Sequence, residues 1–155
     1  QANDKEFWNY NYQNGKTEDE YNLGYYEEIY KCIHLYHDYS ILGHLDLIQR
    51  YNKTIYPFEK SRDIITKILK KVIEDGKGIE VNTSSFAYKL KDLTPSKEIL
   101  KLYYELGGKI ITIGSDSHKA ESIGSHIPLI QQELKNIGFS HFCTFDKMEP
   151  VFHEL

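Results

Sequence analysis

The chain has 155 residues and a mass of 18.2 kDa, which suits one compact domain. Hydrophobic residues make up 40% and charged residues 27%, a globular composition that argues against disorder. The net charge of −4 argues against a nucleic-acid or membrane surface, and no apolar run approaches the ~20 residues of a membrane span. Two cysteines, Cys32 and Cys143, are too few for a disulfide framework and favour a reducing, cytoplasmic location.

Hydrophobic periodicity and capping residues predict a series of helices and strands. Thr17 followed by Glu20 is a capping-box pattern that begins a helix, and a polar loop is expected before it over 1–16. The β-branched run at 109–113 ends in Gly114 and is the clearest strand signal. In chain order the expected elements are helix 17–38, strand 39–43, helix 58–75, strand 78–82, a helix from 94–96 to 107, strand 109–114, helix 127–137 and strand 141–145.

Alternation of strands and helices predicts an α/β fold in which parallel strands are covered by helices. Four strands are too few to close an eight-stranded barrel, so the chain forms either a small open sheet or part of a barrel. The tail from Lys147 onward has no clear assignment.

Polar groups follow three of the expected strands directly. The strand ends read Gly-His-Leu-Asp at 43–46, Glu-Val-Asn-Thr-Ser-Ser at 80–85 and Gly-Ser-Asp-Ser-His at 114–118. The carboxyl ends of parallel strands meet at one edge of a sheet, where α/β proteins carry their functional groups. The sequence therefore predicts a functional site at this edge.

Asp116 and His118 form the most suggestive pair, because residues two apart in extended chain share a face. A carboxylate and an imidazole are common ligands of zinc, manganese or iron, and His44 from another strand could supply a third ligand. The alternative is a capped strand end, in which Asp116 accepts backbone N–H bonds and His118 is exposed.

Other polar residues near the strand ends have two or three interpretations. Asp46 could bind a metal, orient His44 or cap the next turn, and the turn is favoured. Asn82 could bind substrate or hold a loop. Arg50 and Lys89 could contact a phosphate or simply be solvated.

Four segments together resemble the histidinol-phosphate phosphatases of the PHP (polymerase and histidinol phosphatase) family. They are ILGHLDLIQRYN, GKGIEVNTSS, PSKEILKLYYELGGKIITIGSDSHKAESIG and LKNIGFSHFCTFDKMEPV. The resemblance covers about residues 17–152, and the Gly-Ser-Asp-x-His segment is its most specific part.

The resemblance implies a distorted (β/α)₇ barrel that hydrolyses histidinol phosphate to histidinol and phosphate in histidine biosynthesis. It implies zinc, iron or manganese ions held by residues that include His44, Asp116 and His118. We expect Asp116 and His118 to be the catalytic residues, and Arg50, Asn82 and Ser115 to contact a small phosphorylated substrate. Neither nucleic acid nor membrane is an expected partner.

The chain also departs from the family pattern. The early His-x-His and the other early ligand motifs are absent, and Ser85-Phe86-Ala87-Tyr88 stands where members often carry Gly and Arg. The start at Gln1, without Met, also suggests a truncated chain. We therefore expect residues 1–155 to form one domain, the C-terminal part of a PHP phosphatase, inactive or partly active alone and able to self-associate through exposed half-barrel surfaces. The alternatives are another PHP-type phosphoesterase or a non-catalytic interaction domain that keeps the fold.

Overall fold

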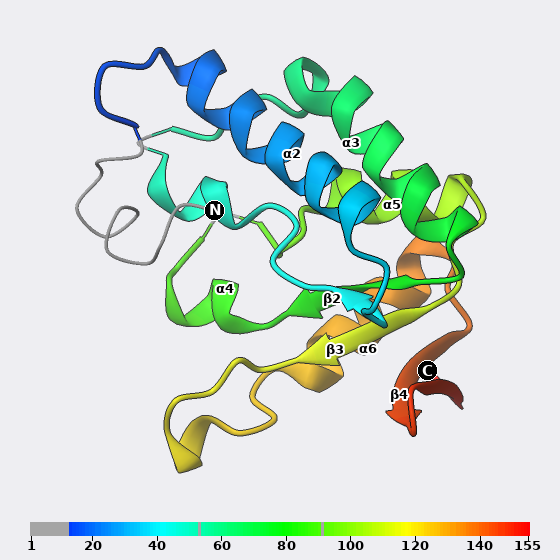
Figure 1. Ribbon diagram of the computed structural model, residues 1–155. Helices are drawn as coiled ribbons and strands as arrows, with labels where there is room; N and C mark the ends of the chain where they lie inside the picture. The colour runs from blue at the N-terminus through cyan, green and yellow to red at the C-terminus, as the bar shows by residue number, and fades with distance from the viewer. Residues whose placement is uncertain (1–12, 53, 91) are drawn as a thin grey trace.

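The computed structural model describes residues 13–52, 54–90 and 92–155 (Figure 1). Most of the loop expected over 1–16 lies outside these residues. The described chain contains a three-stranded parallel sheet, helices packed against it and a two-stranded hairpin near the C-terminus. The α/β class and the parallel strands predicted from sequence are therefore confirmed.

The first described helix, α2 (Glu18–Leu35), begins at the predicted capping box. The Thr17 hydroxyl accepts a hydrogen bond from the Glu20 amide at 3.3 Å, and the Glu20 carboxylate accepts one from the Thr17 amide at 2.7 Å. These reciprocal bonds satisfy two amides that the helix itself leaves unpaired. The helix ends three residues before the expected position, because Tyr36 adopts an extended conformation.

The parallel sheet has the order β1-β2-β3. Its strands are β1 (Ile41–Leu42), β2 (Gly78–Asn82) and β3 (Ile111–Gly114), and their register aligns Leu42 with Ile79 and Ile79 with Ile111. The connections run through α3 (Phe58–Glu74) and α5 (Lys97–Glu105), as expected for parallel neighbours, which need a crossover. All three strands therefore end at the same edge.

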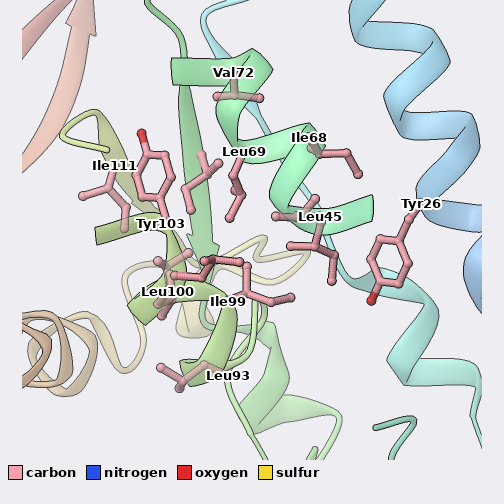
Figure 2. Close-up of a cluster of buried hydrophobic side chains, with 14 of the residues drawn as sticks. Tyr26, Leu45, Ile68, Leu69, Val72, Leu93, Ile99, Leu100, Tyr103 and Ile111 are labelled. Carbon is pink, nitrogen blue, oxygen red and sulfur yellow. The ribbon is translucent and has the colours of Figure 1, made fainter. Parts of the chain in front are cut away.

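The hydrophobic core lies between the sheet and its helices (Figure 2). Ile79 and Val81 of β2 are fully buried, whereas Glu80 between them points to the other face and is half-buried. Helix α3 packs on α2, α5 and β2, and α6 (Ile127–Ile137) packs on α5 and β3. Figure 2 shows the buried side chains of these elements, among them Ile68, Leu69, Val72, Ile99, Leu100 and Tyr103.

The fourth predicted strand forms but does not join the parallel sheet. Strand β4 (His141–Asp146) pairs antiparallel with β5 (Glu149–Glu154), which arises from the unassigned tail. Lys147 and Met148 between them both have positive φ, at 47° and 70°, as the type I′ turns of two-residue hairpins require. The expectation of a fourth parallel strand is thus wrong, because a tight turn supplies β4 with an adjacent partner.

Short elements follow the strand ends and form the edge that carries the candidate site. They are η2 (Leu47–Tyr51) after β1, α4 (Ser84–Ala87) after β2 and η3 (Ala120–Ser122) after β3. Among the described residues, no helix combines the length and apolar character that crossing a lipid bilayer requires.

Candidate functional site

His44 follows the end of β1 in a left-handed backbone conformation, with φ of 52°. This conformation is uncommon for a residue with a Cβ atom and costs on the order of 1 kcal/mol. The Tyr25 hydroxyl donates a 2.6 Å hydrogen bond to the His44 carbonyl, which holds the turn in place. The imidazole Nδ1 of His44 is buried and has no hydrogen-bond partner among the described residues, so it is available to a ligand.

Asp46 is buried and points toward the start of α5. Its Oδ2 accepts a hydrogen bond from the Ser96 amide at 2.8 Å, and Ser96 is the N-cap of that helix. Burial raises the pKa of the Asp46 carboxyl to about 7, because the charged form loses its hydration. Asp46 therefore connects the loop after β1 to the start of α5. The expectation that Asp46 caps its own turn is wrong, because its side chain makes no capping hydrogen bond to η2.

Asp116 and His118 follow β3 on an exposed turn. Asp116 is also left-handed, with φ of 47°, so two of the three predicted metal ligands adopt this uncommon conformation. The His118 Nδ1 lies 3.0 Å from the Asp116 carbonyl oxygen. Since a carbonyl only accepts, Nδ1 carries the proton and Nε2 presents the lone pair that a metal ion would need.

The three predicted metal ligands lie at one edge of the sheet but not in one cluster. Within 13–52, 54–90 and 92–155, no three His, Cys, Asp or Glu side chains are grouped so that they could hold a metal ion. Asp116 and His118 line a hollow of about 410 Å³ together with Ser115 and His126, and His44 is not part of its wall. The ligand roles of His44, Asp116 and His118 therefore stay predictions.

The predicted substrate contacts are held by neighbouring groups. The Arg50 guanidinium lies 3.7 Å from the centre of the Tyr88 ring and donates a 3.2 Å hydrogen bond to the Ser84 hydroxyl. Asn82 is buried, and its Oδ1 accepts a 2.8 Å hydrogen bond from the Ser84 amide, so Asn82 holds the loop after β2. The Ser115 hydroxyl accepts a 3.2 Å hydrogen bond from the Gly124 amide.

Lys89, the other candidate phosphate contact, lies elsewhere. It lines a separate cavity bounded by Asp46 and Tyr56, not the hollow beside Asp116.

Glu80 is a polar group at this edge that pattern analysis did not single out. Its carboxylate lies against Gly43 and Gly114, where a Cβ atom would contact its oxygens. Its Oε2 accepts a hydrogen bond of 3.5 Å from the Asn82 side-chain amide. The sequence signal that could have identified Glu80 is its position as the single acidic residue between Ile79 and Val81 of β2. Side chains alternate along a strand, so Glu80 lies on the face of the sheet opposite to these two core residues.

A stacked ring pair was missed as well. Phe86 and His126 lie with ring centres 4.4 Å apart and planes at 6°. Both residues line the hollow beside Asp116, which gives that hollow an aromatic wall. No sequence signal connects these residues, because they are brought together by loops after different strands.

Residues 2–84 match the protein family described as the PHP domain. The chain is 37% identical over 109 residues to the probable histidinol-phosphatase of Thermotoga maritima, which covers 70% of this chain and 46% of that protein. It is 33% identical over 118 residues to the histidinol-phosphatase of Lactococcus lactis, and this match covers 74% of this chain and 43% of that protein.

Among solved structures, the chain resembles the Lactococcus lactis histidinol phosphate phosphatase complexed with zinc, L-histidinol and phosphate. The TM-score is 0.75 at 26% identity, over 90% of this chain and 54% of that chain. The chain thus spans about half the length of the relatives it matches.

Proposed function

The chain belongs to the PHP domain family, and on that premise we propose that it is the C-terminal part of a metal-dependent phosphatase that hydrolyses histidinol phosphate to histidinol and phosphate. The observation that carries the proposal is the Asp116–His118 turn at the end of β3, in a chain whose curated relatives are named histidinol-phosphatases. A cytoplasmic location, predicted from the two cysteines, belongs to the same proposal.

The proposed architecture is part of a distorted (β/α)₇ barrel, with residues 1–155 as one domain. Three parallel strands with α3 and α5 as crossovers are consistent with one portion of such a barrel. The similarity to 54% of the Lactococcus lactis phosphatase chain supports this proposal. The remaining strands and the missing early ligand motifs would then come from another part of the whole protein.

His44, Asp116 and His118 have the donor atoms that zinc, iron or manganese prefers. The unpartnered Nδ1 of His44 and the exposed Nε2 side of His118 fit the role of ligands. When bound, such a metal supplies Lewis acidity toward the phosphoryl oxygens and lowers the pKa of coordinated water. The Asp116 carbonyl fixes the tautomer of His118, which is the usual way that a neighbouring acceptor orients a ligand imidazole.

Arg50 is the best candidate to hold the substrate phosphate. Stacking on Tyr88 and the bond to Ser84 orient its guanidinium, and its Nε is buried with no partner within the described residues. A guanidinium donates two parallel hydrogen bonds to a phosphate, which fixes the substrate as well as attracting it. Ser115 is proposed to complete this contact from the loop after β3, and Asn82 to contribute from the end of β2, where it holds Ser84, the hydrogen-bond partner of Arg50.

The proposal is tested by adding zinc or manganese to the chain and measuring phosphate release from histidinol phosphate. We expect little or no turnover by this chain alone, because no complete ligand set is assembled in its described residues. We expect activity when a full-length PHP-type relative is assayed in the same way. Robust turnover by the chain alone would contradict the incomplete-site part of the proposal.

Two measurements, metal binding and phosphate release from several phosphomonoesters, distinguish the two alternative functions. Another PHP-type phosphoesterase would bind metal but release phosphate from other small phosphomonoesters in preference to histidinol phosphate. A non-catalytic interaction domain that keeps the fold would bind no divalent metal. The absence of three grouped ligands among the described residues is the observation that favours this second candidate.

Self-association is the proposed behaviour of a partial barrel. Several large apolar side chains are exposed, including Ile123 at 74%, Met148 at 64% and Phe152 at 49%. Exposed apolar area of this kind promotes association between copies of a chain. Light scattering coupled to size-exclusion chromatography should show dimers or larger species at high concentration, and a monomer would contradict the proposal.

A further inference from the structure

The hollow beside Asp116 and His118 has an aromatic wall that the proposed metal and phosphate contacts do not use. Phe86 of α4 and His126, the N-cap of α6, form this wall, with ring centres 4.4 Å apart and planes at 6°. Phe86 is 37% exposed, and His126 is also exposed. The two rings therefore hold each other in place and still have surface free for a ligand.

Three hydroxyl groups that line the hollow have already donated their protons to backbone carbonyls. The Thr83 hydroxyl donates to the Ser125 carbonyl at 2.8 Å, and the Ser125 hydroxyl donates to the Ser122 carbonyl at 2.7 Å. The Ser117 hydroxyl likewise donates to the Lys119 carbonyl at 2.6 Å. Because a hydroxyl has a single proton and two lone pairs, these three groups can only accept a hydrogen bond from a ligand.

Two other hydroxyl groups of the hollow have the opposite polarity. The Ser84 hydroxyl accepts a 3.2 Å hydrogen bond from Arg50, and the Ser115 hydroxyl accepts one of 3.2 Å from the Gly124 amide. Both hydroxyls therefore keep a proton that they can donate to a ligand. Phosphate oxygens accept hydrogen bonds, so they suit these donors beside Arg50, whereas N–H groups suit the acceptors of Thr83, Ser117 and Ser125.

The size and the aromatic wall of the hollow suit a ligand with a flat ring. A cavity of about 150 Å³ is large enough for benzene. The hollow has about 410 Å³, so it has room for a flat ring and a phosphate group together. Flat rings pack favourably against the faces and edges of aromatic side chains, which Phe86 and His126 supply.

We propose that the Phe86–His126 wall determines substrate specificity by binding a flat ring, bearing an N–H group, in the alcohol part of the phosphate ester. The ring packs against the two side chains, and its N–H donates to the hydroxyl oxygens of the hollow that can only accept. This inference rests on the proposed function and deepens it, since the imidazole of histidinol is a ring of this kind. It assigns recognition of the alcohol to Phe86 and His126 and leaves the phosphate to Arg50.

The test uses the metal-free 155-residue chain and three amino alcohols that differ only in their side chains. L-histidinol has a flat ring with an N–H group, L-phenylalaninol has a flat ring without one, and L-leucinol has no flat ring. Calorimetry and amide NMR shifts measure binding at about pH 8, where an imidazole is mostly neutral. We expect saturable one-site binding of L-histidinol, severalfold weaker binding of L-phenylalaninol and at least tenfold weaker binding of L-leucinol. The NMR shifts should map to Phe86 and Ser125, which line the hollow, and not to Phe152, which lies outside it.

Variants separate the proposed ring contacts from general effects. Phe86→Leu removes one ring and keeps apolar volume, and His126→Asn removes the other while keeping a residue that tolerates the left-handed backbone there, with φ of 63°. Each should weaken binding of L-histidinol roughly fivefold or more and leave L-leucinol nearly unchanged. The matched control is Phe152→Leu, because Phe152 also contacts a histidine, His141, with ring centres 6.3 Å apart but outside the hollow. If a variant fails to fold, the three amino alcohols on the unmodified chain decide.

Three outcomes would overturn the proposed ring site. They are equal binding of L-histidinol and L-leucinol, an equal loss in Phe152→Leu and Phe86→Leu, and no saturable binding of L-histidinol. Zinc titration without any amino alcohol reports separately on the phosphatase proposal. Zinc binding without L-histidinol binding would overturn the ring site alone. Binding of L-histidinol that maps to Phe86 without zinc binding would support the ring site and contradict the phosphatase proposal.

Discussion

The side chain of Asp46 accepts a hydrogen bond from the backbone amide of Ser96 at 2.8 Å, although the two residues are 50 positions apart. This bond connects the loop after β1 to the start of α5. It also places Asp46 away from the metal role that its position after His44 suggested. Because the Asp46 side chain that accepts this bond is buried, removal of the bond has a predictable effect on stability.

Asp46→Ala should lower the free energy of unfolding by about 1–3 kcal/mol, because the part-buried Ser96 amide loses its acceptor. Asp46→Asn keeps an oxygen acceptor and should lower the free energy of unfolding less than Asp46→Ala does. Urea unfolding followed by circular dichroism measures both values. The control is Asp38→Ala, an exposed carboxylate whose loss should change stability little, and equal effects of Asp38→Ala and Asp46→Ala would contradict the role of the bond.

Two glycine positions in the sheet should respond differently to alanine. At Gly78 a Cβ atom would overlap the carbonyl oxygen of Ile110, which is backbone and cannot move alone. Gly78→Ala should therefore lower the free energy of unfolding by roughly 1–3 kcal/mol or more. At Gly114 the new Cβ atom would meet the end of the Glu80 side chain, which can rotate away. Gly114→Ala should therefore lower the free energy of unfolding less than Gly78→Ala does.

Thermal unfolding of both alanine variants measures this difference. Combining Gly114→Ala with Glu80→Ala should recover most of the loss at that position, because the obstructing carboxylate is gone. No such rescue is expected at Gly78. An equal loss in the two single variants would show that Glu80 is not free to move.

Metal binding should depend chiefly on the turn after β3. Zinc titration of the chain by calorimetry should detect weak binding of one ion, and Asp116→Asn and His118→Ala should each reduce its affinity at least tenfold, whereas His44→Ala should reduce it less because His44 does not line the same hollow. His34→Ala is a matched control, because His34 is also exposed and its Nδ1 also lies near a backbone carbonyl, that of Tyr30, at 2.8 Å. Equal losses in His34→Ala and His118→Ala would argue against the proposed ligand set.

The ion pair at the end of α3 should contribute a pH-dependent stability. Lys71 Nζ lies 2.6 Å from Asp75 Oδ1, and this hydrogen bond lowers the pKa of Asp75 below its ordinary value. A carboxyl whose pKa is lower in the folded state contributes stability above its unfolded pKa of ~3.9 and loses it as pH falls below that value. The stability of the protein should therefore include an Asp75 contribution at pH 7 that disappears in acid.

Asp75→Asn should lower the free energy of unfolding by about 0.3–0.5 kcal/mol at neutral pH, the usual size of a helical pair at this spacing. The difference in stability between the variant and the original chain should shrink as the pH falls through the range in which the carboxyl becomes protonated in the folded state. A double-mutant cycle with Lys71→Met isolates the pair from other effects. A difference that persists in acid would assign the loss to helix capping instead.

Local sequence signals determined most of the secondary structure. The capping box of Thr17 and Glu20 predicted the start of α2, and the run ending in Gly114 predicted the end of β3, because such signals depend on neighbouring residues. The same signals placed polar residues after three strands and thereby located the edge that carries the candidate site.

Tertiary structure alone decided how the side chains at that edge are directed. The hydrogen bond from Tyr25 to the left-handed turn at His44 and the attachment of Asp46 to Ser96 join residues far apart in sequence, which no short motif encodes. The partner of β4 was also decided this way, since a strand pattern specifies its faces but not its neighbour. Proximity in space between residues distant in sequence depends on the whole backbone, and this is why the sequence located the edge of the site but not its geometry.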